Sequence, residues 1–154
     1  MSVIAWDGRY LAADKASVHG DYMATTTKIC RLDSGILLGW TGTEATGRWL
    51  ANWFVAGADP AAWPSWQSSD QDWAQLVVIE NRKARFYEIT PVANWNEEPF
   101  CAWGSGRDFA IGAMTMGASA VVAVEIASHY CATCGRGVDV IDAAVGEVRE
   151  CDSR

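Results

Sequence analysis

The feature that most constrains the fold of this chain is a pair of short apolar runs at its start. Residues 3–6 and residues 9–13 are mostly apolar, and only Asp7 and Gly8 separate them. Asp-Gly between two runs of this kind is the strongest short-range signal for a β-hairpin. We therefore predict that the chain begins with an antiparallel pair of strands, and that sheets built from such hairpins are antiparallel.

The rest of the chain alternates between strand-like and helix-like patterns. Further strands are predicted at residues 25–32, 35–40, 73–80, 84–89, 100–103 and 138–141. Apolar residues at helical spacing predict helices between residues 43 and 57, at 108–116 and at 120–130. Residues 58–71 and 90–99 hold all the prolines and are predicted to be irregular. Runs of strands alternating with runs of helices favour an α+β fold with layered packing.

Length and composition exclude several classes of protein. The 154 residues, half of them hydrophobic and 20% charged, favour one folded domain, which we expect to span residues 1–154. A net charge of −7 argues against a nucleic-acid partner, because such proteins normally carry a basic face. No apolar run approaches the ~20 residues of a membrane span, and the first residues lack the pattern of a secretory signal. We therefore expect no membrane partner and a cytoplasmic location.

The cysteines favour free thiols over a metal site. They are Cys30, Cys101, Cys131, Cys134 and Cys151. An odd number of cysteines cannot all pair within one chain. Cys131 and Cys134 form a CxxC motif, but a zinc site would need two further ligands, and the only histidines are His19 and His129. We therefore predict free thiols that are buried or half-buried, with no metal and no cofactor.

The second residue offers a candidate nucleophile. Removal of Met1 would place the Ser2 hydroxyl and a free α-amine on one residue, which is the minimal equipment for N-terminal-nucleophile hydrolysis. Such an amine has an unperturbed pKa near ~8, so a usable fraction is neutral at physiological pH. Met-Ser is also a common way to begin a protein, so these two residues alone leave both interpretations open.

Five segments carry a resemblance to a known family. They are Ser-Val-Ile-Ala-Trp-Asp-Gly at 2–8, Leu-Ala-Ala-Asp at 11–14, Thr-Lys-Ile-Cys-Arg-Leu at 27–32, Gly-Trp-Thr-Gly-Thr at 39–43, and the stretch 104–120 that begins Gly-Ser-Gly. In this order the segments resemble proteasome β-type subunits, above all the short bacterial and phage-borne proteasome homologues and the bacterial peptidase HslV. The resemblance covers the chain apart from residues 58–71 and the last few residues.

The resemblance implies a fold, an assembly and a set of site residues. The fold would be a four-layer αββα sandwich, the N-terminal-nucleophile hydrolase fold, with two antiparallel sheets between helix pairs. Ser2 matches the nucleophile, where Thr is usual, and Lys28 matches a buried lysine whose charge lowers the pKa of the terminal amine. Asp14 matches the carboxylate that pairs with this lysine. Gly42 matches the residue whose N–H stabilises the oxyanion, and Ser105 matches a serine that hydrogen-bonds near the amine.

The chain departs from the family pattern at two positions. Ala16 stands where an arginine is usual, which puts one supporting contact in doubt. The family has an aspartate after the second of the two late helices, and the resemblance assigns His129 to that place. A histidine can hydrogen-bond but is not reliably anionic. The second departure leaves two outcomes open, namely reduced activity or a catalytically silent ring subunit.

The expected function follows from the resemblance. It implies a threonine-type endopeptidase that uses an N-terminal serine, forms a homo-oligomeric ring and cleaves polypeptides inside it, with an AAA+ unfoldase as the natural feeder. One alternative is a silent ring or scaffold subunit, which a retained Met1 would favour because a blocked amine removes the base. The other alternative is an amidase acting on a small non-peptide amide, which a monomer or dimer with an open cleft would favour.

Overall fold

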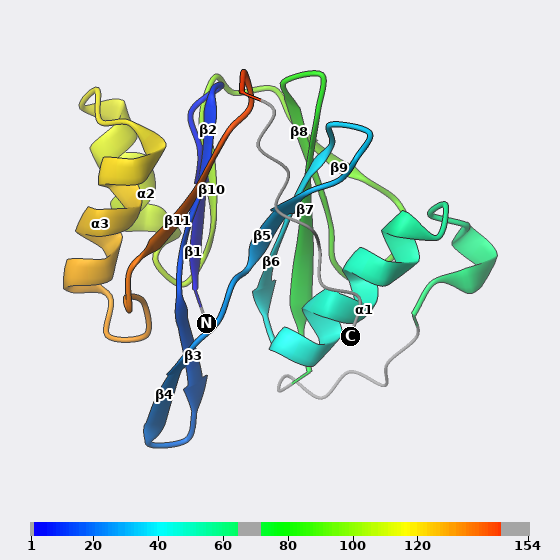
Figure 1. Cartoon of the computed structure of the whole chain (residues 1–154), viewed down its shortest axis with the longest axis horizontal. Coiled ribbons are helices and arrows are strands. Elements are labelled where there is room, and N and C mark those ends of the chain that lie inside the picture. Colours follow the sequence, from blue (N-terminus) through cyan, green and yellow to red (C-terminus); the bar gives the residue numbers. More distant parts are fainter. Residues whose placement is uncertain (1, 65–71, 146–154) are drawn as a thin grey trace.

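The computed structural model describes residues 2–64 and 72–145, which form two antiparallel sheets with helices on their outer faces (Figure 1). The first sheet has the order β10-β1-β2-β11. Its strands are β1 (Val3–Trp6), β2 (Tyr10–Asp14), β10 (Cys101–Gly104) and β11 (Val138–Asp142). The second sheet has the order β5-β6-β7-β8-β9. Its strands are β5 (Ile29–Arg31), β6 (Leu37–Gly42), β7 (Ala74–Glu80), β8 (Lys83–Tyr87) and β9 (Asn94–Asn96).

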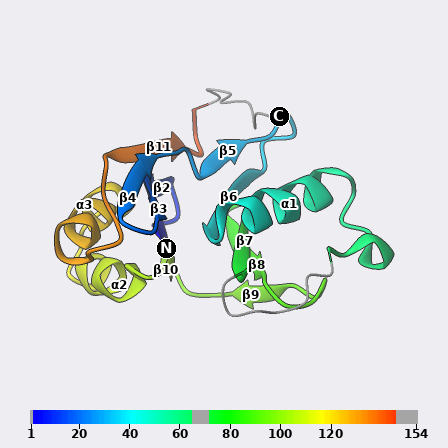
Figure 2. The ribbon, with the colours of Figure 1, turned by 90° about the horizontal axis from the view of Figure 1, so that it is seen from below.

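The helices lie outside the two sheets. α1 (Glu44–Val55) packs against the second sheet, and α2 (Arg107–Thr115) and α3 (Ala120–Tyr130) pack against the first (Figure 2). A short 3-10 helix, η1 (Pro60–Ala62), follows α1. No helix among the described residues is long and apolar enough to cross a membrane.

Strand β1 shows how the layers are held together. Its alternate residues Ile4 and Trp6 join the core between the two sheets, whereas Val3 and Ala5 join the core beneath α2 and α3. Because side chains alternate across a strand, a strand that is covered on both faces must be apolar at every position. The uninterrupted apolar run at 3–6 therefore reflects burial on both sides, and it fixes the strand that directly follows Ser2.

Helix α3 packs closely against the first sheet because the residues on its buried face have small side chains. Ala120, Ala123, Val124 and Ala127 recur at helical spacing and are fully buried. The Ser119 hydroxyl accepts a hydrogen bond from the Val122 N–H at 3.3 Å and caps the helix. The last turns of α3 lie close to where β1 begins, since a Cβ added at Gly106 would lie 2.9 Å from Val3 Cβ and 3.2 Å from Ala127 Cβ.

The predicted hairpins, helices and α+β sandwich are confirmed, and three details differ. The first hairpin pairs β1 with β2 as expected. The region 16–25, where we predicted no strand before residue 25, forms a separate hairpin of β3 (Ala16–His19) and β4 (Tyr22–Thr25). The segment 90–99 contains the short strand β9. Among the described residues the second sheet is covered by the single α-helix α1, whereas a helix pair was expected on each side.

The extra hairpin escaped the sequence pattern for a physical reason. Most of its residues are partly or fully exposed, as Tyr22 shows with 68% exposure. A strand pair that leaves the core on both faces shows no apolar alternation, so periodicity cannot reveal it.

Candidate active site

Ser2 is buried directly before β1, and its backbone is held by the turn that follows β10. Its carbonyl accepts hydrogen bonds from the Gly106 N–H and the Ser105 hydroxyl, both at 3.3 Å. The residue is 1% exposed, and its Oγ has no hydrogen-bond partner within the described part of the chain. Burying a hydroxyl without a partner costs free energy, so such a group calls for a functional reason.

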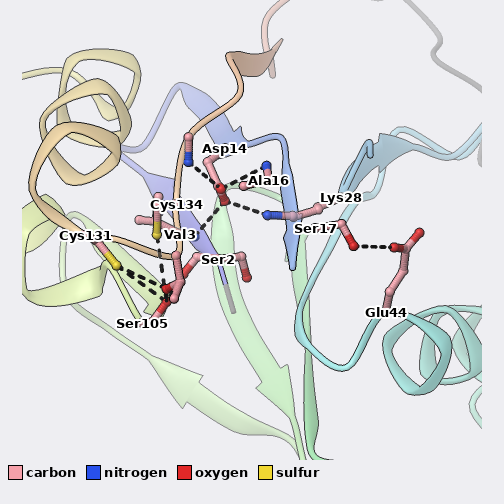
Figure 3. Close-up of polar contacts among 12 residues, drawn as sticks. Ser2, Val3, Asp14, Ala16, Ser17, Lys28, Glu44, Ser105, Cys131 and Cys134 are labelled. Atoms are coloured by element: carbon pink, nitrogen blue, oxygen red, sulfur yellow. Dashed lines mark hydrogen bonds and ion pairs between the residues drawn. The ribbon is translucent and has the colours of Figure 1, made fainter. Parts of the chain in front are cut away.

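A buried ion pair lies directly beside Ser2. Asp14, at the end of β2, accepts a hydrogen bond from Lys28 Nζ at 2.7 Å and from the Val3 N–H at 2.9 Å on the same oxygen (Figure 3). Its second oxygen accepts from the Ala16 N–H at 3.1 Å and from the Gly135 N–H at 3.0 Å. A buried pair is tolerated only when further hydrogen bonds satisfy the charges, and this carboxylate has three backbone donors in addition to the ammonium.

The predicted site residues converge on one cleft. Ser2, Lys28, Gly42 and Ser105 all line a cleft of about 710 Å³, and Asp14 is buried behind Lys28. The volume lies in the range that protein clefts use for ligands. The sequence reasoning thus selected residues that the fold brings together from five separate segments, although their chemical roles remain predictions.

Two glycines shape this cleft by close approach of the backbone. Gly42 ends β6 with φ of +92°, and an added Cβ would lie 2.7 Å from Ala74 Cα. Gly104 ends β10 with φ of +91°, and an added Cβ would overlap the Ser2 carbonyl. Both positions need glycine for its backbone conformation and for space. Gly42 also stands two residues before α1, whose N-terminus contributes a positive partial charge to the cleft.

Glu44 is a charged residue in the lining of the cleft, and the sequence analysis missed it. It accepts hydrogen bonds from Ser17 Oγ at 3.0 Å, Thr26 Oγ1 at 2.9 Å and Arg48 Nε at 3.1 Å. Partial burial raises the pKa of this carboxyl, but the hydrogen bonds from Thr26, Ser17 and Arg48 outweigh burial and hold the pKa below its ordinary value. Trp40 lies beside it in the lining of the same cleft. Trp40 lies within the segment 39–43 and Glu44 directly follows it, but the sequence analysis assigned neither side chain a role, and only the fold shows that both line the cleft.

Ser105 is surrounded by residues from the turn after α3. Its Oγ lies 3.0 Å from Thr133 Oγ1 and 3.8 Å from the sulfur atoms of both Cys131 and Cys134 (Figure 3). The sequence analysis noted the CxxC spacing but could not place it, because the contact joins residues 26 to 29 positions apart.

His129 lies in the last turn of α3 and not in the turn that follows the helix. Its ring contacts the ring of Tyr130 at 4.8 Å between centroids, and its side chain is not among the groups that contact Ser105. The chain beyond α3 turns back, so that residues 131–134 reach the site and residue 129 stays outside. Among residues 2–64 and 72–145, no three His, Cys, Asp or Glu side chains are grouped to hold a metal ion.

Solved structures with similar folds are proteasome-like proteins. BPH from Thiobacillus denitrificans in complex with epoxomicin has a TM-score of 0.68 and 20% identity, covering 93% of this chain and 99% of that chain. A second structure of BPH from the same organism has a TM-score of 0.66 and 17% identity, covering 92% of this chain and 97% of that chain. Eukaryotic HslV from Trypanosoma brucei has a TM-score of 0.64 and 18% identity, covering 91% of this chain and 97% of that chain.

No family model and no curated protein matches the chain. At identities of 20% or less, the likeness to these structures shows the fold and leaves the activity to be tested. The chain has an α+β sandwich fold similar to that of the BPH and HslV structures.

Proposed function

We propose that this protein is a peptidase whose nucleophile is the N-terminal Ser2, exposed by removal of Met1. One observation carries the proposal: the buried Ser2 hydroxyl lacks a hydrogen-bond partner among the described residues, and Ser2 lines the same cleft as Lys28, which pairs with Asp14. A structural serine in a strand would be satisfied by a neighbour, whereas a nucleophile must be free to attack.

The proposed reaction uses a single residue as nucleophile and base. The neutral α-amine of processed Ser2 takes the proton from its own Oγ, directly or through water, while Oγ attacks the carbonyl carbon of a peptide bond. The positive charge of Lys28 favours the neutral amine. The N–H of Gly42, at the positive end of α1, stabilises the oxyanion. The protonated amine then gives its proton to the leaving amine, and water hydrolyses the acyl-enzyme.

The proposal extends to the assembly. BPH and HslV support a ring-forming homo-oligomer made of one domain per chain, in which the clefts face an inner chamber. The substrates would then be polypeptides, with an AAA+ unfoldase as feeder, and the ring would act in the cytoplasm without a nucleic-acid or membrane partner.

One observation favours a second candidate, a ring subunit without activity. The groups that contact Ser105 from the turn after α3 are thiols and a hydroxyl, with no carboxylate among them. If proton transfer at the amine needs an anion at that point, the ring would form but would not hydrolyse peptides.

Peptide hydrolysis by the full chain tests the proposal. Intact mass should show loss of Met1, and the purified protein should hydrolyse unfolded polypeptides. Ser2→Ala should abolish this activity, Ser2→Thr should retain it, and Ser34→Ala, at an exposed turn, should leave it unchanged. A ring that retains Met1 and does not cleave peptides would move the protein to the silent-subunit class, and cleavage of small amides alone would favour the amidase alternative.

A further inference from the structure

The CxxC motif forms a compact turn next to the candidate site. The Cys134 N–H donates a hydrogen bond to the Cys131 carbonyl at 3.1 Å, so residues 131–134 close a β-turn. Such a turn brings its end Cα atoms within about 7 Å, and disulfides span Cα separations of about 4.4–6.8 Å. Both residues are free thiols, and both sulfur atoms lie 3.8 Å from Ser105 Oγ. The backbone therefore already presents the two thiols at a spacing that a disulfide can bridge.

The two thiols differ in the way that attacking and resolving cysteines differ. Cys131 is partly exposed, and Cys134 is 6% exposed. Burial raises the pKa of Cys131, but hydrogen bonds with Thr133, Cys134 and Ser105 outweigh it and lower the pKa to about 7. Burial, the hydrogen bond with Cys131 and the charge of Asp14 raise the pKa of Cys134 to about 12. An accessible thiolate beside a buried partner thiol is typical of cysteines that react with oxidants.

The turn is connected to the candidate site by two hydrogen bonds. The Ser105 hydroxyl, which both sulfur atoms contact, donates to the Ser2 carbonyl at 3.3 Å. The N–H of Gly135, the residue after Cys134, donates to Asp14 at 3.0 Å. A change at the two sulfur atoms therefore acts on the backbone of Ser2 and on the carboxylate that holds Lys28.

We propose that Cys131 and Cys134 are a redox-active dithiol, which hydroperoxides oxidise to an intramolecular disulfide that slows chemistry at Ser2. The Cys131 thiolate attacks an oxygen of the peroxide, so that an S–O bond forms, the O–O bond breaks and the departing oxygen takes up a proton. The Cys134 sulfur then attacks the resulting sulfenic acid, so that the S–S bond forms and the hydroxyl leaves as water with the Cys134 proton. With hydrogen peroxide, the dithiol loses two electrons and the peroxide is reduced to water.

The disulfide would disturb the site for two reasons. Disulfide sulfur carries no hydrogen, so Ser105 loses the hydrogen bond that the Cys131 thiol donates to its oxygen. The two sulfur atoms must also approach to about 2.05 Å, which moves the turn that contains Gly135 and its hydrogen bond to Asp14. The coupling to Ser2 chemistry rests on the proposed peptidase function, whereas disulfide formation does not.

The first test measures the disulfide itself. The full chain is treated with hydrogen peroxide and digested with trypsin, which yields a peptide, 108–136, that contains these two cysteines and no other. We expect this peptide to lose two hydrogen atoms and to regain them with dithiothreitol. Cys101→Ser should behave as the parent, and Cys131→Ser and Cys134→Ser should not form the bond. Recovery of free Cys134 with Cys131 converted to a sulfinic acid would overturn the proposal.

The second test measures the coupling with two independent readouts. Labelling of Ser2 by a peptide epoxyketone should slow by about three- to tenfold on oxidation, the rate equivalent of one lost hydrogen bond, and recover on reduction, while Cys131→Ser should not respond to peroxide. Amide hydrogen exchange at residues 105–106 and 135 should accelerate in the disulfide form. A disulfide that changes neither readout would overturn the coupling. If the disulfide accelerates amide exchange but Ser2 is never labelled, the effect of the disulfide on the backbone around the site is upheld. The proposed peptidase function is then rejected.

Discussion

Lys28 Nζ lies 2.7 Å from Asp14 Oδ1, and the two side chains are 6% and 0% exposed. The pair stands at the end of β2 and just before β5, so it joins the two sheets beside the cleft that Ser2 and Lys28 line. An ammonium buried at this point serves the proposed chemistry, because it keeps a positive charge next to the nucleophile. The fold can hold it there only because Asp14 compensates the charge.

Removal of the lysine charge should therefore cost both stability and activity. Lys28→Met leaves Asp14 buried without its cation, and we expect the free energy of unfolding to fall by about 3–5 kcal/mol. Chemical denaturation measures this loss. Lys83→Met, at an exposed position of β8, should change it by less than about 0.5 kcal/mol. Equal effects of the two substitutions would show that the buried pair is not held as described.

A methyl group at Gly104 should displace the nucleophile. Gly104→Ala places a Cβ against the Ser2 carbonyl at φ of +91°, and we expect a loss of more than about 1 kcal/mol of stability together with most of the activity. Gly112→Ala is the matched control, because that glycine lies in α2 with no atom within 4 Å of an added Cβ. It should stabilise the protein by up to about 1 kcal/mol. Thermal unfolding and peptide hydrolysis distinguish the two.

The reactivity of Cys131 should depend on pH near neutrality. Because its pKa is lowered to about 7, the thiolate fraction and the rate of alkylation by iodoacetamide should rise as the pH passes from 6 to 8 and then level off. Burial raises the pKa of Cys101 to about 12, so this thiol should stay unmodified until the protein unfolds. Mass spectrometry of the two tryptic peptides gives both rates. A Cys131 rate that keeps rising to pH 9 would contradict the lowered pKa.

The Glu44 carboxylate should stabilise the fold only above its titration range. Partial burial raises its pKa, but hydrogen bonds from Thr26, Ser17 and Arg48 lower it further, below the ordinary value of 4.5. A depressed folded pKa means that the stabilisation is fully present above pH 4.5 and is lost as the pH falls through the folded pKa. Glu44→Gln should therefore cost about 1 kcal/mol at pH 7, allowing for solvent screening, and less at pH 3.

A control separates this local effect from the general loss of negative charge. Glu97→Gln removes a charge from an exposed loop residue, so thermal unfolding at pH 7 should be nearly unchanged. If the two glutamate substitutions give the same pH profile, the hydrogen bonds from Thr26 and Ser17 do not stabilise the ionised carboxyl.

Local patterns predicted the elements, and the resemblance predicted the site residues. Asp7-Gly8 between apolar runs predicted the β1–β2 hairpin, and the spacing of small apolar residues predicted α3 with its observed bounds. The contact between Lys28 and Asp14 was implied by the resemblance and is present. The hairpin and α3 could be predicted because their patterns lie within a few neighbouring residues. The Lys28–Asp14 contact could be predicted because the order of the five segments resembles a known family.

The rest depended on contacts between distant segments. Nothing near Cys131 in the sequence indicates Ser105, because the contact is set by how α2 and α3 pack and by the turn that follows. The resemblance assigned His129 to a position after the second late helix, but α3 continues to Tyr130, and it is Cys131, Thr133 and Cys134 from the following turn that contact Ser105. Glu44 was missed for a similar reason, because two of its donors lie on or beside the β3–β4 hairpin, which has no apolar signature.

The most direct measurement is tandem mass spectrometry of the first peptide of the chain after reaction with a peptide epoxyketone. This reagent class requires both a hydroxyl and a free amine on the same residue. The account predicts that the peptide begins at Ser2, that the adduct maps to Ser2, and that Ser2→Ala prevents its formation. A peptide that still begins with Met1, or an adduct located on any other residue, would contradict it.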